Sequence, residues 1–297
     1  MASAPRLAVF TKNLTNPAYA GARTGAERTA ARFGAKVDHY VPEAPDDLEQ
    51  QRALIRDALR ARPDAVVLSP VDPTALNGEI GGLVEAGIPI VFLVSRAEGI
   101  PCVSYVSGDD YRLAYDIAGY LFDHIGRRGK VLLVDGHPVS TTTGPRARGF
   151  RDAARQHHGI TVAGACHGDY QRAPAEKAVS PLLQAHPDVA GVATANDVMA
   201  LGVVDAMAAL GRHAPVVGVN AIPEAIKALQ QGTLLATSAF NAMAMACLAT
   251  EAAIRHLRGE TIPAEIMLPT EVVHAGNCAA WDLPYEERPL PEWPGNR

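Results

Sequence analysis

The sequence predicts an α/β protein built from two consecutive sets of parallel strands covered by helices on both faces. Three observations lead to this fold class. Strand-like and helix-like segments alternate along nearly the whole chain, and several strand segments are apolar throughout, which is typical of parallel strands buried on both faces. The alternation also restarts near residue 102. The length of 297 residues fits about two domains.

The first set of elements covers residues 6–94. Asn16 and Pro17 open its first helix and Gly34 ends it, in line with the residue preferences at the N-cap, N1 and the C-terminal cap. We expect strands at 6–10, 35–40, 64–70 and 88–94, and helices at 16–34, 45–63 and 74–87.

The second set repeats the same kind of layer without repeating the sequence. We expect strands at 102–106, 129–136, 160–168, 190–195 and 214–220, and helices at 109–126, 145–159, 173–187 and 196–211. A strand and a long helix follow within 233–260, then one late strand within 266–276. The Pro-rich tail from Trp281 is expected to be irregular.

Composition excludes several classes of protein. A formal net charge of -5 argues against a protein that grips nucleic acid backbones. No apolar run approaches the roughly 20 residues that a membrane-spanning helix needs. The start, MASAPRLAVF, lacks a signal-peptide pattern, so we expect either a cytosolic protein or one whose signal peptide was replaced by Met. The four cysteines lack metal-type spacing and are expected to be buried free thiols, with one disulfide as the alternative.

Polar residues follow many of the expected strands. Ligands of open parallel sheets bind beyond the carboxyl ends of the strands, so these residues are binding candidates. Each also has an ordinary structural role: Asn16 and Asn196 can cap helices, Lys12 can be a surface charge, and Tyr19 can be a core residue. The candidate segments are 12–19, 69–72, 94–96, Gly136 to Gly144, 167–170, 196–197, 220–221 and 240–241.

Catalytic motifs are missing from the sequence. There is no G-x-S-x-G, no phosphate-binding P-loop, no H-E-x-x-H, and no G-x-G-x-x-G after the first strand. The loop DGHPVSTTTG holds His137 and three threonines, a composition typical of a turn network or of contacts to a polar ligand. We therefore predict no catalytic residue, no cofactor and no metal site.

Several stretches resemble the sugar-type periplasmic binding proteins, the ribose- and allose-binding group of receptors for ABC importers. The resemblance runs from Leu7 to about Val273. Its markers are KNLTNPAY, PDAVVLSPVDPTAL, AGIPIVFL, RARGF, HPDVAGVATANDVMALGVVDAM, VVGVNAIPEAIKALQQGTLLATSAFN and AAIRHLRGE.

The resemblance implies two Rossmann-like lobes joined by a three-crossing hinge, with the ligand in the interlobe cleft. The crossings would lie near Ser107, Thr237 and Pro269. The N-terminal lobe would comprise residues 5–107 plus 238–268, and the C-terminal lobe 108–237 plus 269–297. Closure around the ligand would be a hinge motion.

The resemblance also assigns ligand-binding positions. Aromatic rings would cover the C–H faces of a sugar and planar polar groups would bind its hydroxyls. Some positions depart from the family: Ser95 and Asn220 stand in place of aspartates, Gly144 in place of an arginine and Ala18 in place of an aromatic. The predicted ligand-binding residues are Lys12, Asn16, Tyr19, Ser95, Arg96, Thr143, Tyr170, Asn196, Asn220, Phe240 and Asn241.

The function implied is that of a monomeric solute receptor that passes a small polar molecule to an ABC transporter permease. Its location would be the periplasm, after removal of a signal peptide. A monosaccharide or polyol is the expected ligand. With two family carboxylates replaced, a small carboxylic acid or a furanosyl signal is an alternative. A further alternative is the effector domain of a lac-repressor-type regulator; the chain begins directly at the first strand, without a helix-turn-helix. The last alternative is that the protein is an α/β enzyme.

Overall fold

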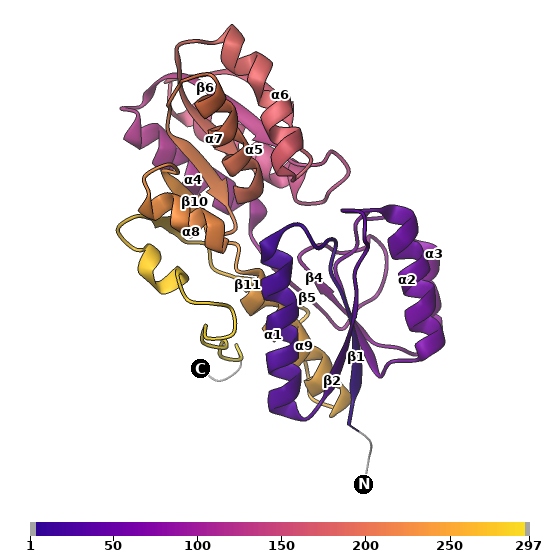
Figure 1. Cartoon of the computed structure of the whole chain (residues 1–297). Helices are drawn as coiled ribbons and strands as arrows, with labels where there is room; N and C mark the ends of the chain where they lie inside the picture. Colours follow the sequence, from indigo (N-terminus) through magenta and orange to yellow (C-terminus); the bar gives the residue numbers. More distant parts are fainter. Residues whose placement is uncertain (1–3, 295–297) are drawn as a thin grey trace. The chain divides into compact units, whose positions relative to one another are not determined.

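The computed structural model describes residues 4–294, and the chain forms two compact units (Figure 1). Unit 1 comprises the residues up to Gly108, Asn241–Leu268 and the tail from Pro284. Unit 2 comprises Asp109–Phe240 and Pro269–Leu283. The tail is thus part of unit 1, whereas the sequence analysis groups it with the second lobe.

Unit 1 is built on a parallel sheet with the strand order β11-β5-β4-β3-β1-β2. All its neighbouring strands pair in parallel, as the continuous apolar strand segments predict. Its strands are β1 (Arg6–Phe10), β2 (Lys36–Tyr40), β3 (Ala65–Leu68), β4 (Ile90–Leu93), β5 (Ser104–Gly108) and β11 (Glu265–Leu268).

Helices cover both faces of this sheet (Figure 1). On one face lie α1 (Pro17–Phe33) and α9 (Ala242–Leu257), which pack against each other, and on the other lie α2 (Leu48–Ala61) and α3 (Asn77–Glu85). Phe10, Leu68 and Phe92, one from each of three strands, pack with α2 and α3 in a single buried cluster. The sequence prediction of α1 is confirmed, because Asn16 caps it and Gly34 ends it at a φ of 72°.

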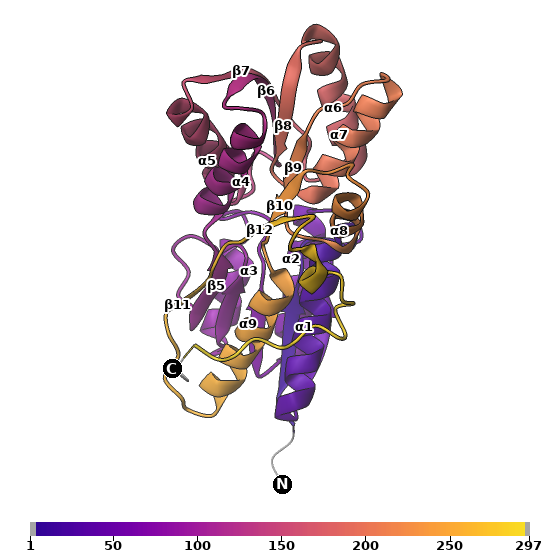
Figure 2. The ribbon, with the colours of Figure 1, turned by 90° about the vertical axis from the view of Figure 1, so that its left-hand side faces the viewer.

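Unit 2 repeats the arrangement with the strand order β12-β10-β9-β8-β6-β7 (Figure 2). Its neighbours pair in parallel except β10 and β12, which are antiparallel. The strands are β6 (Arg128–Asp135), β7 (Gly159–His167), β8 (Val189–Thr194), β9 (Val216–Val219), β10 (Ala236–Ser238) and β12 (Val272–His274).

The helices of unit 2 pack as two pairs on its sheet (Figure 2). One pair is α4 (Asp110–His124) with α5 (Thr143–Gln156), and the other is α6 (Arg172–Ala185) with α7 (Asp197–Ala209). The short helix α8 (Pro223–Gln230) was not predicted from periodicity. It has only eight residues, little more than two helical turns, so the hydrophobic periodicity repeats too few times to indicate a helix.

One late strand was expected within 266–276, and the structure has two there instead. β11 joins the sheet of unit 1 beside β5, and β12 joins the sheet of unit 2 beside β10. Pro269 follows β11, at the point where the chain leaves unit 1. A proline cannot donate to a strand ladder, so the apolar run is interrupted there.

The C-terminal tail is fastened to unit 1 by specific contacts. Arg28 of α1 donates hydrogen bonds to the carbonyl oxygens of Tyr285 (2.8 Å) and Arg288 (2.7 Å). The Tyr285 ring lies against Gly21, where an added Cβ would come within 2.6 Å of it. Arg255 of α9 lies 4.8 Å from the centroid of the Trp293 ring. A segment without regular structure is thereby held in place.

We expect Arg28→Met to lower the free energy of unfolding by about 1–3 kcal/mol, because it removes two hydrogen bonds from a charged donor. Urea unfolding with an unchanged m-value is the measurement. Arg32→Met, at an exposed position one turn further along α1, is the control. Equal stability of the two variants would contradict a stabilising role for the tail contacts.

Candidate functional site

Polar candidates lie at the carboxyl ends of the strands in both units. In unit 1 they follow β1, β3 and β4, and in unit 2 they follow β6, β7, β8, β9 and β10. We call them the first and the second strand-end group. The first comprises Lys12, Asn13, Asn16, Tyr19, Asp72 and Ser95, and the second comprises Thr142, Thr143, Arg146, Tyr170, Asn196, Asn220 and Phe240.

The loop after β1 is organised by Asn13. Its Oδ1 accepts a hydrogen bond from the backbone N–H of Asn16 (2.9 Å), and its Nδ2 donates to Oδ2 of Asp46 (3.0 Å). Asn13 is buried. The sequence analysis placed Asn13 in the loop but did not predict this role. Its partner Asp46 is 33 residues away along the chain, so spacing carried no signal.

Asn16 has the capping role that its position before Pro17 suggests. Its Oδ1 accepts a hydrogen bond from the backbone N–H of Ala18 (3.0 Å). The cap uses only the side-chain oxygen, so capping and donation of an N–H to a ligand are compatible. Tyr19 is buried in the first turn of α1, which is consistent with a core role as well as with a ligand contact.

Lys12 is nearly enclosed, with only 4% of its surface exposed, and an acidic residue lies near it. Burial alone would raise the pKa of Asp72. Hydrogen bonds from the backbone of Ala75 and Thr74, the Thr74 hydroxyl and the charge of Lys12 together hold that pKa below its ordinary value. The ammonium group therefore has a carboxylate that compensates part of its charge.

Ser95 and Arg96 lie in different environments although they are adjacent. Ser95 is fully buried, whereas the side chain of Arg96 is 57% exposed. Nη1 of Arg96 donates to Oε1 of Glu265 at 3.0 Å, and its guanidinium lies 5.1 Å from the centroid of the Tyr105 ring. The structure thus places Arg96 in an exposed ion pair with β11, and its contact with a ligand stays a prediction.

Tyr170 forms an aromatic wall in the second strand-end group. Its ring lies against Gly136, where an added Cβ would come within 2.1 Å of the ring carbon Cζ. The Tyr170 hydroxyl lies 2.7 Å from Oγ1 of Thr142 and accepts a hydrogen bond from Oγ1 of Thr143 at 3.0 Å. Burial raises the pKa of this hydroxyl, so it stays protonated at neutral pH.

The backbone around Tyr170 has an unfavourable conformation. Asp169 and Tyr170 both have positive φ angles, of 52° and 59°. The left-handed conformation costs a non-glycine residue about 1–2 kcal/mol, and such strain is concentrated at functional sites. The fixed hydroxyl and the strained backbone together preorganise the ring.

Asn196 contacts the backbone of Tyr170 and caps α7. Its Oδ1 accepts the backbone N–H of Met199 at 2.8 Å, and its Nδ2 donates to the carbonyl oxygen of Tyr170 at 3.3 Å. The structure therefore brings together three predicted residues, Thr143, Tyr170 and Asn196. Their contact with a ligand stays a prediction.

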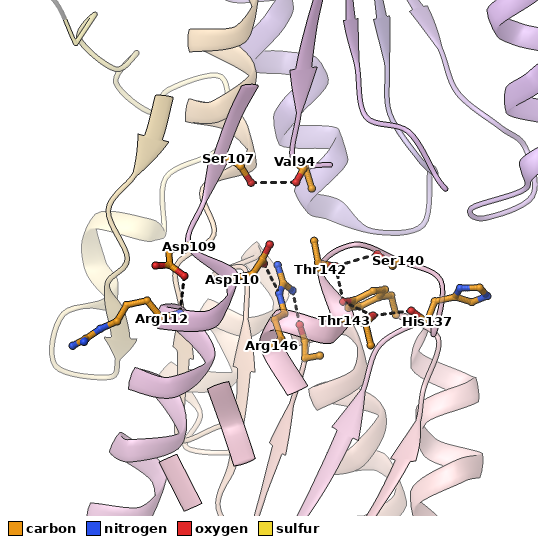
Figure 3. Close-up of polar contacts among 12 residues, drawn as sticks. Val94, Ser107, Asp109, Asp110, Arg112, His137, Ser140, Thr142, Thr143 and Arg146 are labelled. Atoms are coloured by element: carbon orange, nitrogen blue, oxygen red, sulfur yellow. Dashed lines mark hydrogen bonds and ion pairs between the residues drawn. The ribbon is translucent and has the colours of Figure 1, made fainter. Parts of the chain in front are cut away.

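Arg146 contacts the segments that carry these residues. It is the main residue of the second strand-end group that the sequence analysis did not predict. Its Nε donates to Oδ1 of Asp110 at 2.7 Å, and its Nη1 donates to the carbonyl oxygen of Ala195 at 2.6 Å (Figure 3). Its guanidinium lies 4.9 Å from the centroid of the Phe240 ring. The stretch RARGF at the start of α5 was the available signal, but it does not show which of its arginines is buried.

Phe240 and Asn241 are adjacent but belong to different units. Phe240 faces Arg146 in unit 2. Asn241 caps α9 in unit 1, where its Oδ1 accepts the backbone N–H of Ala244 at 3.0 Å. The structure thus gives each a structural role, and a role in ligand binding for either remains a prediction.

Asn220 ends β9 in an unusual conformation. Asn220 and Ala221 have positive φ angles of 129° and 55°. The next residue, Ile222, donates its backbone N–H to the buried carboxylate of Asp197 (3.0 Å). The same carboxylate accepts a hydrogen bond from the Thr237 hydroxyl (2.6 Å). Burial raises the pKa of Asp197 to about 6.

Residues 4–294 contain no cluster of three or more His, Cys, Asp or Glu side chains that could hold a metal ion. In the same range no helix is long and apolar enough to span a membrane. The four cysteines are free thiols. The expectation that they are all buried holds for Cys247 and Cys278 and is wrong for Cys102, which is exposed, and for Cys166, which is partly exposed.

Comparisons with known proteins identify the family of this chain. Residues 7–261 match the family model described as "Periplasmic binding protein domain". The chain belongs to this family of binding proteins. It is 28% identical over 259 residues to the ribose import binding protein RbsB of Bacillus subtilis, covering 87% of this chain and 84% of that protein.

Solved structures show the same two-lobed fold. A periplasmic solute binding protein of an ABC transporter from Actinobacillus succinogenes, with bound D-allose, has a TM-score of 0.88 and 27% identity, covering 92% of this chain and 99% of that one. An ABC transporter solute binding protein from Mycobacterium smegmatis, with bound glycerol, has a TM-score of 0.86 and 28% identity, covering 93% and 96%.

The buried Asp197 predicts a specific pH dependence of stability. Because its pKa is raised in the folded protein, ionisation costs stability above about pH 6, and this cost disappears as the pH falls below about 4. We expect the stability of Asp197→Asn relative to wild type to be higher at pH 7 than at pH 4, by about 2–3 kcal/mol.

Urea unfolding at both pH values measures this difference. Asp169→Asn, at an exposed position, is the control for removal of a carboxylate outside the buried cluster. A difference between Asp197→Asn and wild type that does not change with pH would contradict the assignment.

Proposed function

We propose that this protein is the solute-binding receptor of an ABC importer and that its ligand is a neutral monosaccharide or polyol. The observation that supports a neutral ligand is the balance of charges at the strand ends. Arg96 pairs with Glu265, Arg146 pairs with Asp110, and the charge of Lys12 acts on Asp72. Each candidate cation thus has an acidic neighbour, which favours a ligand without a charge of its own.

The groups that face a ligand in this proposal are mostly neutral. Asn16, Asn196 and Asn220 carry amides that donate and accept hydrogen bonds, and Ser95 and Thr143 carry hydroxyls that do the same. Sugar hydroxyls also donate and accept, so they match this set. The Tyr170 ring, held against Gly136, supplies an apolar face for C–H groups.

The relatives support the same class of ligand. One is named for ribose import, and two solved structures hold D-allose and glycerol. All three of these molecules are neutral and rich in hydroxyl groups. The names of these relatives also support a periplasmic location and delivery to an ABC transporter permease.

In this proposal the protein works without chemistry on its ligand. Residues of both strand-end groups bind the same molecule, and the chain crossings between the units act as the hinge. Binding shifts the population towards a closed state that a monomeric receptor presents to its permease. Exclusion of water on closure strengthens each polar contact and penalises each unpaired group.

A thermal-shift panel of aldoses, polyols, cyclitols and sugar acids tests the proposal. A ligand at 100 times its dissociation constant adds about 2.7 kcal/mol of stability, which visibly raises the melting temperature. We expect hits among neutral sugars or polyols. Hits confined to acids would mean that Ser95 and Asn220 mark a change to a carboxylate ligand, and the proposed ligand class would be wrong.

Lys12→Met gives a second reading of the ligand class. Loss of the Lys12 ammonium should weaken binding of a neutral ligand by about ten- to a hundredfold, since one hydrogen bond from a charged donor is worth about 1.5–3 kcal/mol. A calorimetric titration measures the change. Loss of all measurable binding would instead indicate that Lys12 pairs with a charge on the ligand.

Gly136→Ala tests the aromatic wall. The added Cβ would overlap the Tyr170 ring, so the ring must move, and we expect the affinity to fall about tenfold or more while the protein stays folded. Gly144→Ala is the matched control, because its Cβ would meet only Nη1 of Arg148, at 3.5 Å. Equal affinities in the two variants would exclude Tyr170 from the ligand site.

A further inference from the structure

The chain passes between the two units at four points, and the residues next to two of them contact one buried arginine, Arg146. The chain leaves unit 1 after Gly108 and enters unit 2 at Asp109, and it leaves unit 2 after Phe240. Asp110 is the first residue of α4, directly after the first of these crossings. Phe240 is the last residue of unit 2 before the second crossing. Both residues contact Arg146.

Arg146 holds these two segments with different parts of one guanidinium. Its Nε donates to the Asp110 carboxylate, and its Cζ lies over the Phe240 ring, 4.9 Å from the centroid. The Arg146 side chain is 4% exposed and that of Asp110 is 10% exposed, so solvent weakens the ion pair little. Arginine suits this position because its rigid, planar group can donate sideways and stack at the same time.

The same guanidinium also reaches the ligand-facing residues proposed above. Nη1 donates to the carbonyl oxygen of Ala195, the residue before Asn196. The centroid of the Tyr170 ring lies 5.9 Å from the guanidinium carbon. One buried group therefore connects the segment that carries Asn196 with two of the four chain crossings, those after Gly108 and Phe240, through contacts that all lie within unit 2.

We propose that Arg146 is a positioning residue that couples the ligand-facing side chains Asn196 and Tyr170 to these two crossings. Through them it sets the balance between open and closed conformations and the rate at which ligand leaves. The part that concerns ligand release rests on the proposed receptor function. The part that concerns conformational balance needs no ligand. Removing the guanidinium removes its ion pair with Asp110 and its contact with the Phe240 ring.

Distance distributions between two spin labels test the conformational part without ligand. The labels are placed at the exposed positions Glu85 in unit 1 and Lys177 in unit 2, with Cys102 and Cys166 replaced by serine. We expect Arg146→Met to broaden or shift the distribution. The control, Arg148→Met, makes the same replacement at an exposed position on the same helix and should leave it unchanged.

Milder variants keep the test valid if Arg146→Met does not fold. Arg146→Lys keeps the charge and loses the planar stack, and Phe240→Leu keeps the arginine and loses the ring. Each should change the distribution less than Arg146→Met, and their effects should not add, because both break the same contact. A merely structural role would lower the melting temperature and leave the distance distribution unchanged, and that result would overturn the proposal.

The second measurement is the dissociation rate of a neutral sugar that the thermal-shift panel has identified as a ligand. We expect Arg146→Met to raise the dissociation rate about tenfold with a smaller change in the association rate, as for loss of a buried, paired charge. An unchanged dissociation rate would overturn the coupling to the ligand. If no panel compound binds, the receptor proposal fails while the label distances still decide the role of Arg146.

Discussion

A polar side chain buried at the carboxyl end of a parallel strand is stabilised by partners within the protein, and this requirement shapes both strand-end groups. A buried polar group without a partner costs about 1–3 kcal/mol, and a buried charge costs more. In the second group the guanidinium of Arg146 meets this requirement for Asp110 and for the carbonyl oxygen of Ala195 at once. In the first, Asn13 bonds the backbone of Asn16 and the carboxylate of Asp46.

The same requirement limits the ligand that the protein can hold. The resemblance implies that Ser95 and Asn220 replace carboxylates, and two buried acidic side chains near the second strand-end group already bind protein groups: Asp110 pairs with Arg146, and Asp197 accepts hydrogen bonds from Thr237 and Ile222. The cations are compensated in the same way. In the proposed receptor the groups left to face a ligand are mainly amides, hydroxyls and the ring of Tyr170, and these suit a neutral molecule rich in hydroxyl groups.

Local signals in the sequence predicted much of the fold. They could not predict contacts between residues that are far apart along the chain. The alternation of strands and helices, the cap at Asn16 and the position of Tyr170 after β7 follow from neighbours a few residues away. Arg146 was missed because its partners Asp110 and Ala195 are 36 and 49 residues distant. Likewise, the exposed pair of Arg96 depends on Glu265, 169 residues later, in a strand that periodicity had merged with β12.

A crystal structure of the protein with the tightest ligand of the panel tests the central claim most directly. The account predicts one neutral molecule with its C–H face on the Tyr170 ring and hydroxyls hydrogen-bonded to Asn196 and Asn16. A carboxylate paired with Lys12, or a ligand bound away from the strand ends, would contradict it.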